Sequence, residues 1–417
     1  MHMKLITNCL LLILALSLIS CKDDITNPDI STFKFVTNEN FILENERKWV
    51  LIYNSNNIVV AEDELENDIE IELEFNSDNS NSLYTVQIVS TLFDGKDEVC
   101  DIYTYTNVEP NIWKLSGDTK SVRPTRLGVN KLEFNDGSHD NFHFRHIQNL
   151  GNGNKNYSTN KIYMDQYYNP DILWICLHDD GERPYYKLIE DVSLNENFTI
   201  SSSDLTQMEC VIDYQIPQSR YSSIYINSDQ TYGDDIKPNF RIYRDDQYES
   251  SRTITGYYPD NLFSHYRMHL FVYTDSYSEV MEFCGSSLPT VFHQIEIEEV
   301  VNNRSIQNFN STITGEADFV KHFWENSNYD FINGNKIFRY YVFSPITGDY
   351  SFSAPSLPDF ITELNPDFID LKKLALKLSA YSKVDNSSNY SDYINREFIN
   401  PEQKQNFSLK ITKELFQ

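Results

Sequence analysis

The sequence predicts a mainly β protein built of tandem antiparallel β-sandwich domains with little helix. From Ile69 to Phe75, apolar residues alternate with glutamates, and a period of two places one set on a core face and the other in water. Asp-Gly pairs at 94–95, 136–137 and 180–181 indicate tight turns, because both residue types tolerate positive φ. The 28 Tyr and 26 Phe also favour strands.

The N-terminal elements follow these rules in order. Residues 49–53 and 58–60 are apolar and are separated by Asn54-Ser55-Asn56-Asn57, which predicts a hairpin. The alternating strand at 69–75 precedes an Asn/Ser-rich turn and a further strand at 84–89. With seven or so short strands, residues 41–116 resemble the immunoglobulin-like and transthyretin-like sandwiches, although the cysteine and tryptophan pattern of true immunoglobulin domains is absent.

One later segment has two interpretations. Within residues 367–381, Leu371, Leu374 and Leu378 share a helical face. Leu374, Leu376 and Leu378 alternate equally well as in a strand, so the sequence leaves helix and strand open here.

A loose recurrence divides the chain. Val108 leads to Trp113-Lys114-Leu115-Ser116, Val192 to Phe198-Thr199-Ile200-Ser201, and Val300 to Phe309-Asn310-Ser311-Thr312. Chance matches in strand-rich sequence explain this equally well. The recurrence places the domains as follows: a first sandwich at 41–117, a second at 118–215, a β-rich third domain at 216–311, and a β-rich C-terminal domain, or an extension of the third, at 312–417.

Residues 1–20 have the composition of a signal peptide. After Lys4, residues 5–18 are mostly apolar, a run too short for a membrane-spanning helix of ~20 residues. The run ends at Leu18-Ile19-Ser20-Cys21, which resembles the bacterial lipobox. The resemblance implies that Cys21 becomes the acylated first residue of the mature chain. An ordinary secretory signal with a chance cysteine is the alternative.

The residues after Cys21 indicate where the anchored chain faces. Lys22-Asp23-Asp24 looks like the acidic tract of Bacteroidota surface lipoproteins. This resemblance implies an outer-membrane protein that is held in the membrane by the acyl chains of Cys21 and faces the cell exterior. A solvated linker is the alternative reading of the acidic tract. Residues 21–40 are polar, contain Asn27-Pro28, and are expected to form a flexible tether.

The charge balance excludes one class of partner. The chain has 34 Lys and Arg against 62 Asp and Glu, a net charge of -28 that becomes -29 when Lys4 is removed with the signal peptide. Such a chain disfavours nucleic acid and other polyanions. The sequence has no Asp-x-Asp-x-Asp-Gly calcium loop. We therefore expect no metal and no cofactor.

Four of the six cysteines remain once Cys9 is cleaved off and Cys21 is acylated. Cys100, Cys176, Cys210 and Cys284 lie far apart in the sequence, without the paired spacing of a zinc site. The apolar run at 172–177 favours a buried free thiol at Cys176. A Cys176 to Cys210 disulfide is the alternative in an oxidising compartment.

The histidines do not form a convincing catalytic or metal site. His139, His143 and His146 are close in sequence, but a strand over 141–147 places the last two on opposite sides. His265 and His269 lack the glutamate of the HExxH motif, and their surroundings favour a strand as well as a helix. Structural roles are the simpler interpretation.

Acid pairs and nucleophile motifs give no better catalytic signal. The adjacent carboxylates at 179–180, 234–235 and 245–246 are expected by chance in an acidic chain. Glycoside hydrolysis needs two carboxyl groups ~5 to 9.5 Å apart across the scissile bond, which neighbours in a turn do not provide. No nucleophile elbow, phosphate loop or dinucleotide fingerprint occurs in the sequence. We therefore predict no catalytic residue.

Aromatic rings on loops or open strand faces are the remaining candidates for a binding site, because the C–H faces of sugars stack on rings. These candidates are Tyr157, Tyr163, Tyr167, Tyr168, Tyr257, Tyr258 and Trp324. Most aromatic residues of β-sandwiches pair across strands, so core or ladder positions are the alternative.

Three functions fit these observations. A surface lipoprotein that captures a glycan or other nutrient, beside an outer-membrane protein partner, is favoured, and its plan is similar to that of the outer-membrane starch-binding lipoproteins. An adhesin or structural surface protein is the alternative, and a degradative enzyme comes third. The helical-repeat sugar-binding lipoproteins do not fit, because their repeat periodicity is missing from the sequence.

Overall fold

The protein is mainly β, as the sequence predicts. The computed structural model describes residues 30–77, 82–117, 127–135, 144–149, 152–158, 161–166, 172–178, 182–228, 241–248, 251–330, 334–365, 368–385, 387, 389–401 and 408–417. Helices in these ranges are short: η2 (Ser202–Asp204), η3 (Ile306–Asn308), α2 (Asp359–Thr362), η4 (Leu371–Lys373), α3 (Tyr390–Ile394) and η5 (Asn395–Ile399). None of the helices there is long and apolar enough to cross a membrane.

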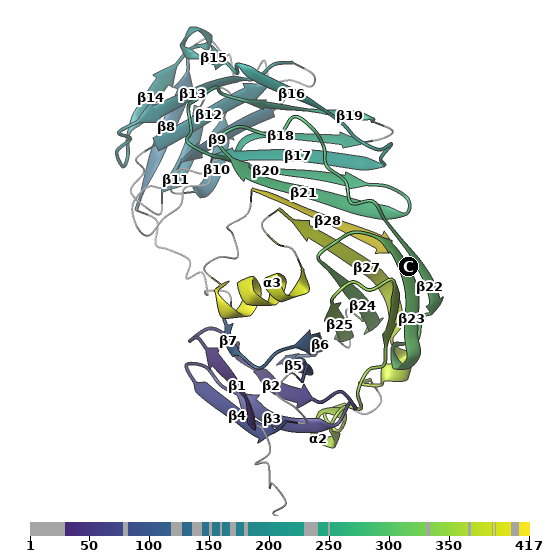
Figure 1. The fold of residues 1–417 in the computed structure, drawn as a ribbon. Coiled ribbons are helices and arrows are strands. Elements are labelled where there is room, and N and C mark those ends of the chain that lie inside the picture. Colours follow the sequence, from purple (N-terminus) through teal and green to yellow (C-terminus); the bar gives the residue numbers. More distant parts are fainter. Residues whose placement is uncertain are drawn as a thin grey trace, which may run out of the picture.

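A curved twelve-stranded sheet forms the centre of the molecule (Figure 1). Its strands, in spatial order, are β18 (Arg241–Tyr248), β17 (Tyr221–Ser228), β20 (Tyr266–Tyr273), β21 (Tyr277–Gly285), β28 (Leu409–Phe416), β27 (Ala375–Val384), β24 (Phe319–Asn328), β25 (Lys336–Ser344), β6 (Asp97–Val108), β5 (Tyr84–Asp94), β2 (Glu46–Tyr53) and β3 (Val59–Leu65). β25 and β6 pair in parallel. The C-terminal strand β28 lies between β21 and β27 and joins the two halves of the sheet.

The N-terminal segment forms a sandwich with one end of this sheet. A three-stranded sheet, β1 (Ile30–Thr37), β4 (Glu70–Asn76) and β7 (Ile112–Leu115), packs against β2 and β5. The predicted β2–β3 hairpin and the alternating strand are confirmed. Residues 30–37 correct the predicted tether: Phe33 and Phe35 alternate with Lys34 and are fully buried, which makes this segment a strand.

A second sandwich lies at the other end of the molecule (Figure 1). Its sheets contain β10 (Asn152–Ser158), β11 (Lys161–Gln166), β8 (Gly128–Phe134) and β14 (Asn197–Ile200) in one layer, and β15 (Thr206–Gln207), β13 (Tyr185–Glu190), β12 (Ile172–His178) and β9 (Phe144–Asn149) in the other. In both sandwiches the first strand pairs in parallel with a strand from near the end of that unit, β1 with β7 and β8 with β14. The first two members of the sequence recurrence therefore occupy equivalent positions.

The cysteines agree with the buried-thiol interpretation. Strand β12 is buried on both faces, with Leu173 towards its own sandwich and Trp174 and Cys176 towards the core beneath the long sheet. Cys176, Cys100 and Cys210 form no disulfide in the described part of the chain, so the Cys176 to Cys210 bridge is absent. Burial raises the pKa of the Cys176 and Cys100 thiols.

Two smaller sheets complete the fold. A two-stranded sheet pairs β16 (Cys210–Gln215) with β19 (Thr253–Tyr258), and a three-stranded sheet contains β22 (Ile297–Asn303), β23 (Phe309–Gly315) and β26 (Asp349–Phe352). The predicted boundary at 312 falls inside β23, and the long sheet takes strands from 41–117, 216–311 and 312–417 alike. In the segment at 367–381 the strand interpretation holds for β27, after one turn of η4.

The long sheet has two unlike faces at β24 and β25. Its covered face, marked by His322, Trp324 and Tyr340, is fully buried beneath the β22–β23–β26 sheet. Its open face carries Phe323 and Tyr341, which are partly exposed and stack at 4.8 Å. Helix α3 lies on the inner side of the curve, opposite β22 and β23 (Figure 1).

Candidate binding site

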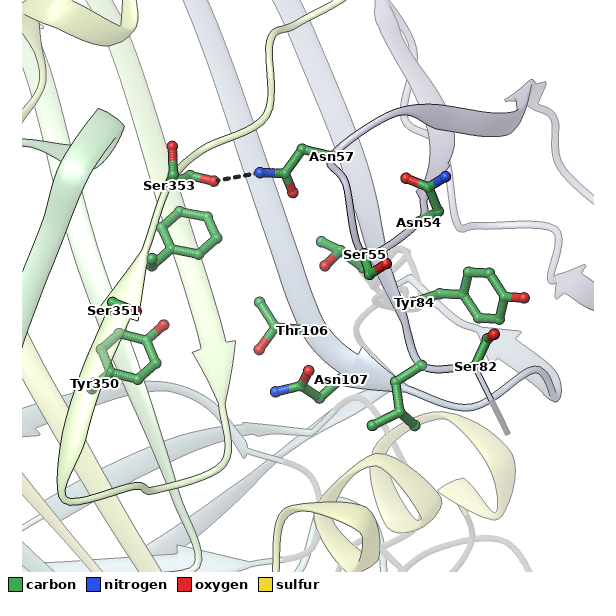
Figure 2. Close-up of a pocket in the computed structure, with 13 residues that line it drawn as sticks. Asn54, Ser55, Asn57, Ser82, Tyr84, Thr106, Asn107, Tyr350, Ser351 and Ser353 are labelled. Carbon is green, nitrogen blue, oxygen red and sulfur yellow. Dashed lines mark hydrogen bonds between the residues drawn. The ribbon is translucent and has the colours of Figure 1, made fainter. Parts of the chain in front are cut away.

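A polar cavity of about 580 Å³ lies where the N-terminal sandwich meets the β22–β23–β26 sheet (Figure 2). Its lining comes from the β2–β3 turn, the start of β5, the end of β6 and β26: Asn54, Ser55, Asn57, Ser82, Leu83, Tyr84, Thr85, Thr106, Asn107, Tyr350, Ser351, Phe352 and Ser353. The volume is within the range of small-molecule sites, which is ~300 to 1,000 Å³.

Turn chemistry places the asparagines at the rim. Asn57 (φ 59°) and Asn107 (φ 55°) adopt the left-handed backbone that Asn tolerates better than most residues. The Asn54 side chain accepts hydrogen bonds from the backbone N–H groups of Asn56 and Ile58, which holds the β2–β3 turn. Asn57 Nδ2 donates to the Ser353 carbonyl at 3.4 Å and links this turn to β26 (Figure 2).

Two β-bulges adjoin the cavity. The β5–β6 register shifts between Tyr84 and Val86, opposite Thr106 and Asn107. The β2–β3 register shifts next to Tyr53. Bulges re-aim side chains and end regular pairing, and they are over-represented beside functional sites. Here one of them turns two polar residues of β6 towards β26 (Figure 2).

Two buried tyrosines adjoin the cavity. Tyr84 is 3% exposed, and its ring packs edge-on against Phe75 at 5.0 Å. Tyr350 shares a hydrogen bond with Ser344 and stacks on His322 at 5.0 Å. Burial raises the pKa of the Tyr350 hydroxyl. Because these rings are fixed by the core, the polar groups beside them are held on a rigid base.

The lining favours hydrogen bonding to an uncharged ligand. None of the described residues that line this cavity is charged. Within the described ranges, the exposed Asn107 amide and Ser351 hydroxyl form no side-chain hydrogen bond, so both are available. Amides and hydroxyls donate and accept equally well, as sugar hydroxyls require. Among the described lining residues there is no carboxylate, imidazole or amine side chain.

A buried contact between His322 and Glu299 lies on the covered face, next to Tyr350 of the cavity lining. His322 Nε2 is 2.9 Å from Glu299 Oε1, and both side chains are fully buried. Burial of the Glu299 carboxyl raises its pKa. Its hydrogen bonds, above all to His322, and the charge interaction with His322 have the opposite and larger effect, so the pKa lies below its ordinary value. This contact connects the β22–β23–β26 sheet, which carries Tyr350, to the long sheet.

The aromatic residues singled out from the sequence are not brought together. Trp324 is fully buried, and its indole N–H donates to the Arg304 carbonyl, so it is a core residue and not an exposed ring. Tyr258 is 8% exposed and packs on Tyr266, and Tyr257 is partly exposed against Tyr243. The alternative of core or ladder positions describes these rings.

The remaining tyrosines lie elsewhere. Tyr163 on β11 is exposed and belongs to a different sheet from Tyr257, Tyr258 and Trp324. Tyr167 and Tyr168 lie outside the described residues, and the side chain of Tyr157 does so too. Cys21 likewise lies outside the described ranges.

The histidines and acid pairs that the sequence offered have structural explanations where they are described. His269 lies on β20, and its Nδ1 is 3.6 Å from Glu282, so the strand interpretation is correct there. Asp246 accepts hydrogen bonds from Tyr221 and Arg244 within the sheet. His139, His143 and the acids at 179–180 and 234–235 lie outside the described residues. Among the described residues, no group of three metal-ligating side chains forms.

Comparison of the sequence with protein-family models finds no match, and comparison with curated proteins finds none either. The cavity therefore has to be interpreted from its own chemistry. The sequence predicts a turn at Asn54 to Asn57 and a strand at Tyr84, but it does not predict that both segments line one cavity. The available signal was the Asn, Ser and Thr residues at strand ends, such as Thr106-Asn107 and Ser351.

Proposed function

We propose that the protein is a lipoprotein of the outer membrane, anchored through acylated Cys21 and facing the cell exterior, that binds a neutral glycan in the polar cavity. The observation that carries the binding function is the uncharged lining, in which amides and hydroxyls occur together with aromatic residues. Sugars are recognised by many hydrogen bonds together with contact to apolar faces. The anchor rests on the lipobox-like sequence Leu18-Ile19-Ser20-Cys21.

The chemistry of the cavity favours capture over degradation. Cleavage of a glycosidic bond by the usual route needs two carboxyl groups on either side of that bond. The described lining contains neither Asp nor Glu. A binding protein on the cell surface needs only the hydrogen-bonding groups and an open mouth. Several lining residues, among them Asn57, Asn107 and Ser351, are exposed to solvent.

The first experiment is a glycan array with soluble residues 25–417, followed by calorimetric titration of any hit. We expect saturable binding of a neutral glycan. Asn107→Gly and Asn57→Gly remove the amides but keep a residue that tolerates positive φ, so each should weaken binding about 2- to 10-fold, as expected for one hydrogen bond. Asn261→Gly, at another positive-φ position (φ 53°), is the matched control and should bind normally.

Two results would count against glycan binding here. A blank array, repeated with folded protein, would favour the adhesin or structural function, and partners should then be sought among outer-membrane proteins. A hit that both asparagine variants bind as tightly as the control does would place the glycan at another site.

The anchor is tested separately in the cell that makes the protein. Labelled fatty acid should be incorporated into the full-length chain and not into the Cys21→Ala variant, because a lipobox cysteine is the acylated residue. Protease added to intact cells should degrade the protein if it faces outwards. Labelling that persists in the variant would refute the anchor, and protection from protease in intact cells would refute the outward orientation.

A further inference from the structure

A second cavity of about 250 Å³ lies on the open face of the long sheet, and it shares no lining residue with the polar cavity. Strands β24, β25, β27 and β28 form its floor, and α3 with η5 covers one side. Phe319 and Tyr393 stack at 4.0 Å and provide an apolar wall. Ser382 and Thr412, whose hydroxyl groups lie 3.2 Å apart, contribute polar atoms.

Three cations line this small cavity in a chain with a net charge of -28. They are Lys321, Arg396 and Lys410, and Glu397 is the one carboxylate among the described lining residues. Lys410 pairs with Glu282 at 3.0 Å. A local excess of positive charge inside a strongly acidic protein is the reverse of what the composition predicts.

Among the residues that the structure describes, Lys321 and Arg396 have no direct counter-ion. Within the described ranges neither forms a salt bridge or a side-chain hydrogen bond, and both are partly buried. Arg396 interacts electrostatically with Asp318, which accepts a hydrogen bond from the Val384 N–H. Removing a charge from water without a partner costs free energy, so two such cations beside one cavity create a site that an anion stabilises.

We propose that this cavity binds the anionic group of an acidic sugar, a carboxylate or a sulfate. Lys321 and Arg396 pair with the anionic group, and an arginine binds planar carboxylates or sulfates with two parallel hydrogen bonds. The Phe319–Tyr393 wall contacts the apolar face of the ring, and Ser382 and Thr412 bind a hydroxyl. The protein then has two sites of different selectivity, one for neutral and one for acidic saccharide units.

The test is calorimetric titration of residues 25–417 with glucuronate, glucose 6-sulfate and neutral glucose. We expect one or both acidic sugars to bind, with an affinity that falls as salt is added, and glucose not to bind at this site. Lys321→Gln/Arg396→Gln should weaken binding of the acid at least about tenfold. The two acids distinguish a carboxylate ligand from a sulfate ligand.

The matched control is Lys377→Gln/Lys383→Gln, which removes two exposed cations from β27 outside the cavity lining. It should bind the acid normally apart from a small long-range charge effect. Thermal unfolding separates a binding role from a structural one: unpaired cations are not needed for stability, so the Lys321/Arg396 variant should melt at or above the wild-type temperature. No binding of either acid at about 10 mM, or equal loss in both double variants, would overturn the proposal.

Discussion

The two faces of strand β24 differ although they belong to the same ten residues. Odd-numbered positions such as Lys321 and Phe323 lie on the open face and are partly exposed, whereas His322 and Trp324 lie on the covered face and are fully buried. Strand β25 repeats the pattern with Tyr341 and Tyr340. A period of two thus divides one strand into a structural set and a set that reaches solvent.

This contrast teaches that aromatic content alone does not identify a binding surface. Trp324 is the larger ring and was a candidate binding residue from the sequence. In the structure it forms an edge-on contact with Phe309 at 5.1 Å inside the core. Phe323, its neighbour, belongs to a row of stacked rings with Tyr341 and Tyr103 that remains partly open. Which of the two rings is exposed depends on which face of β24 the β22–β23–β26 sheet covers.

The largest effect should come from breaking the covered face. Trp324→Ala should lower the free energy of unfolding by about 3 to 5 kcal/mol, because it leaves a cavity and an unpaired Arg304 carbonyl. Phe323→Ala, one residue away, should cost only about 1 kcal/mol, since it loses mainly a stacking contact. Chemical denaturation measures both. Equal losses would show that the two faces do not differ in the way described.

A smaller effect on the free energy of unfolding should come from Glu299 and should depend on pH. Because the pKa of Glu299 is lowered in the folded protein, its contribution to stability is present above its ordinary value of about 4.5 and is lost as pH falls through the lowered pKa. Glu299→Gln removes this contribution. The difference in unfolding free energy between wild type and variant should therefore shrink as the solution is acidified below about pH 4.5.

Groups with raised pKa values act in both proteins and cancel in this comparison. Asp101 on the open face is one, since burial raises its pKa more than Arg339 lowers it. Denaturant titrations at several pH values give the difference directly. A constant difference over the acidic range would show that the Glu299–His322 pair carries no favourable charge interaction.

Local patterns in the sequence predict several features of the fold. The alternation at 69–75, the hairpin at 49–60 and the buried Cys176 follow from period, turn residues and apolar runs, and all three are present. The binding cavity could not be predicted from such rules, because long-range pairing brings Ser351 to Asn57 and Asn107, which lie hundreds of residues earlier in the sequence. The neighbouring cations Lys321 and Arg396 were not predicted for the same reason.

Long-range pairing also explains why the predicted division of the chain did not match the sheet. The parallel ladder between β6 and β25 joins residues 98–105 to 336–343, and no local pattern records that contact. Residues 30–37 were misplaced for a simpler reason. The alternation of Phe33 and Phe35 with Lys34 is short and follows a polar segment, so composition outweighed period in that stretch.

The central position of β28 sets the order in which the molecule is completed. Strand β28 follows both of its ladder partners, β21 and β27, in the sequence, so these two edges stay unpaired until residues 409–416 have been synthesised. Exposed edges attract other strands, and contacts this distant in sequence form slowly. A nascent chain therefore carries two open edges of sheet until β28 is available, and protection by a chaperone matters most until then.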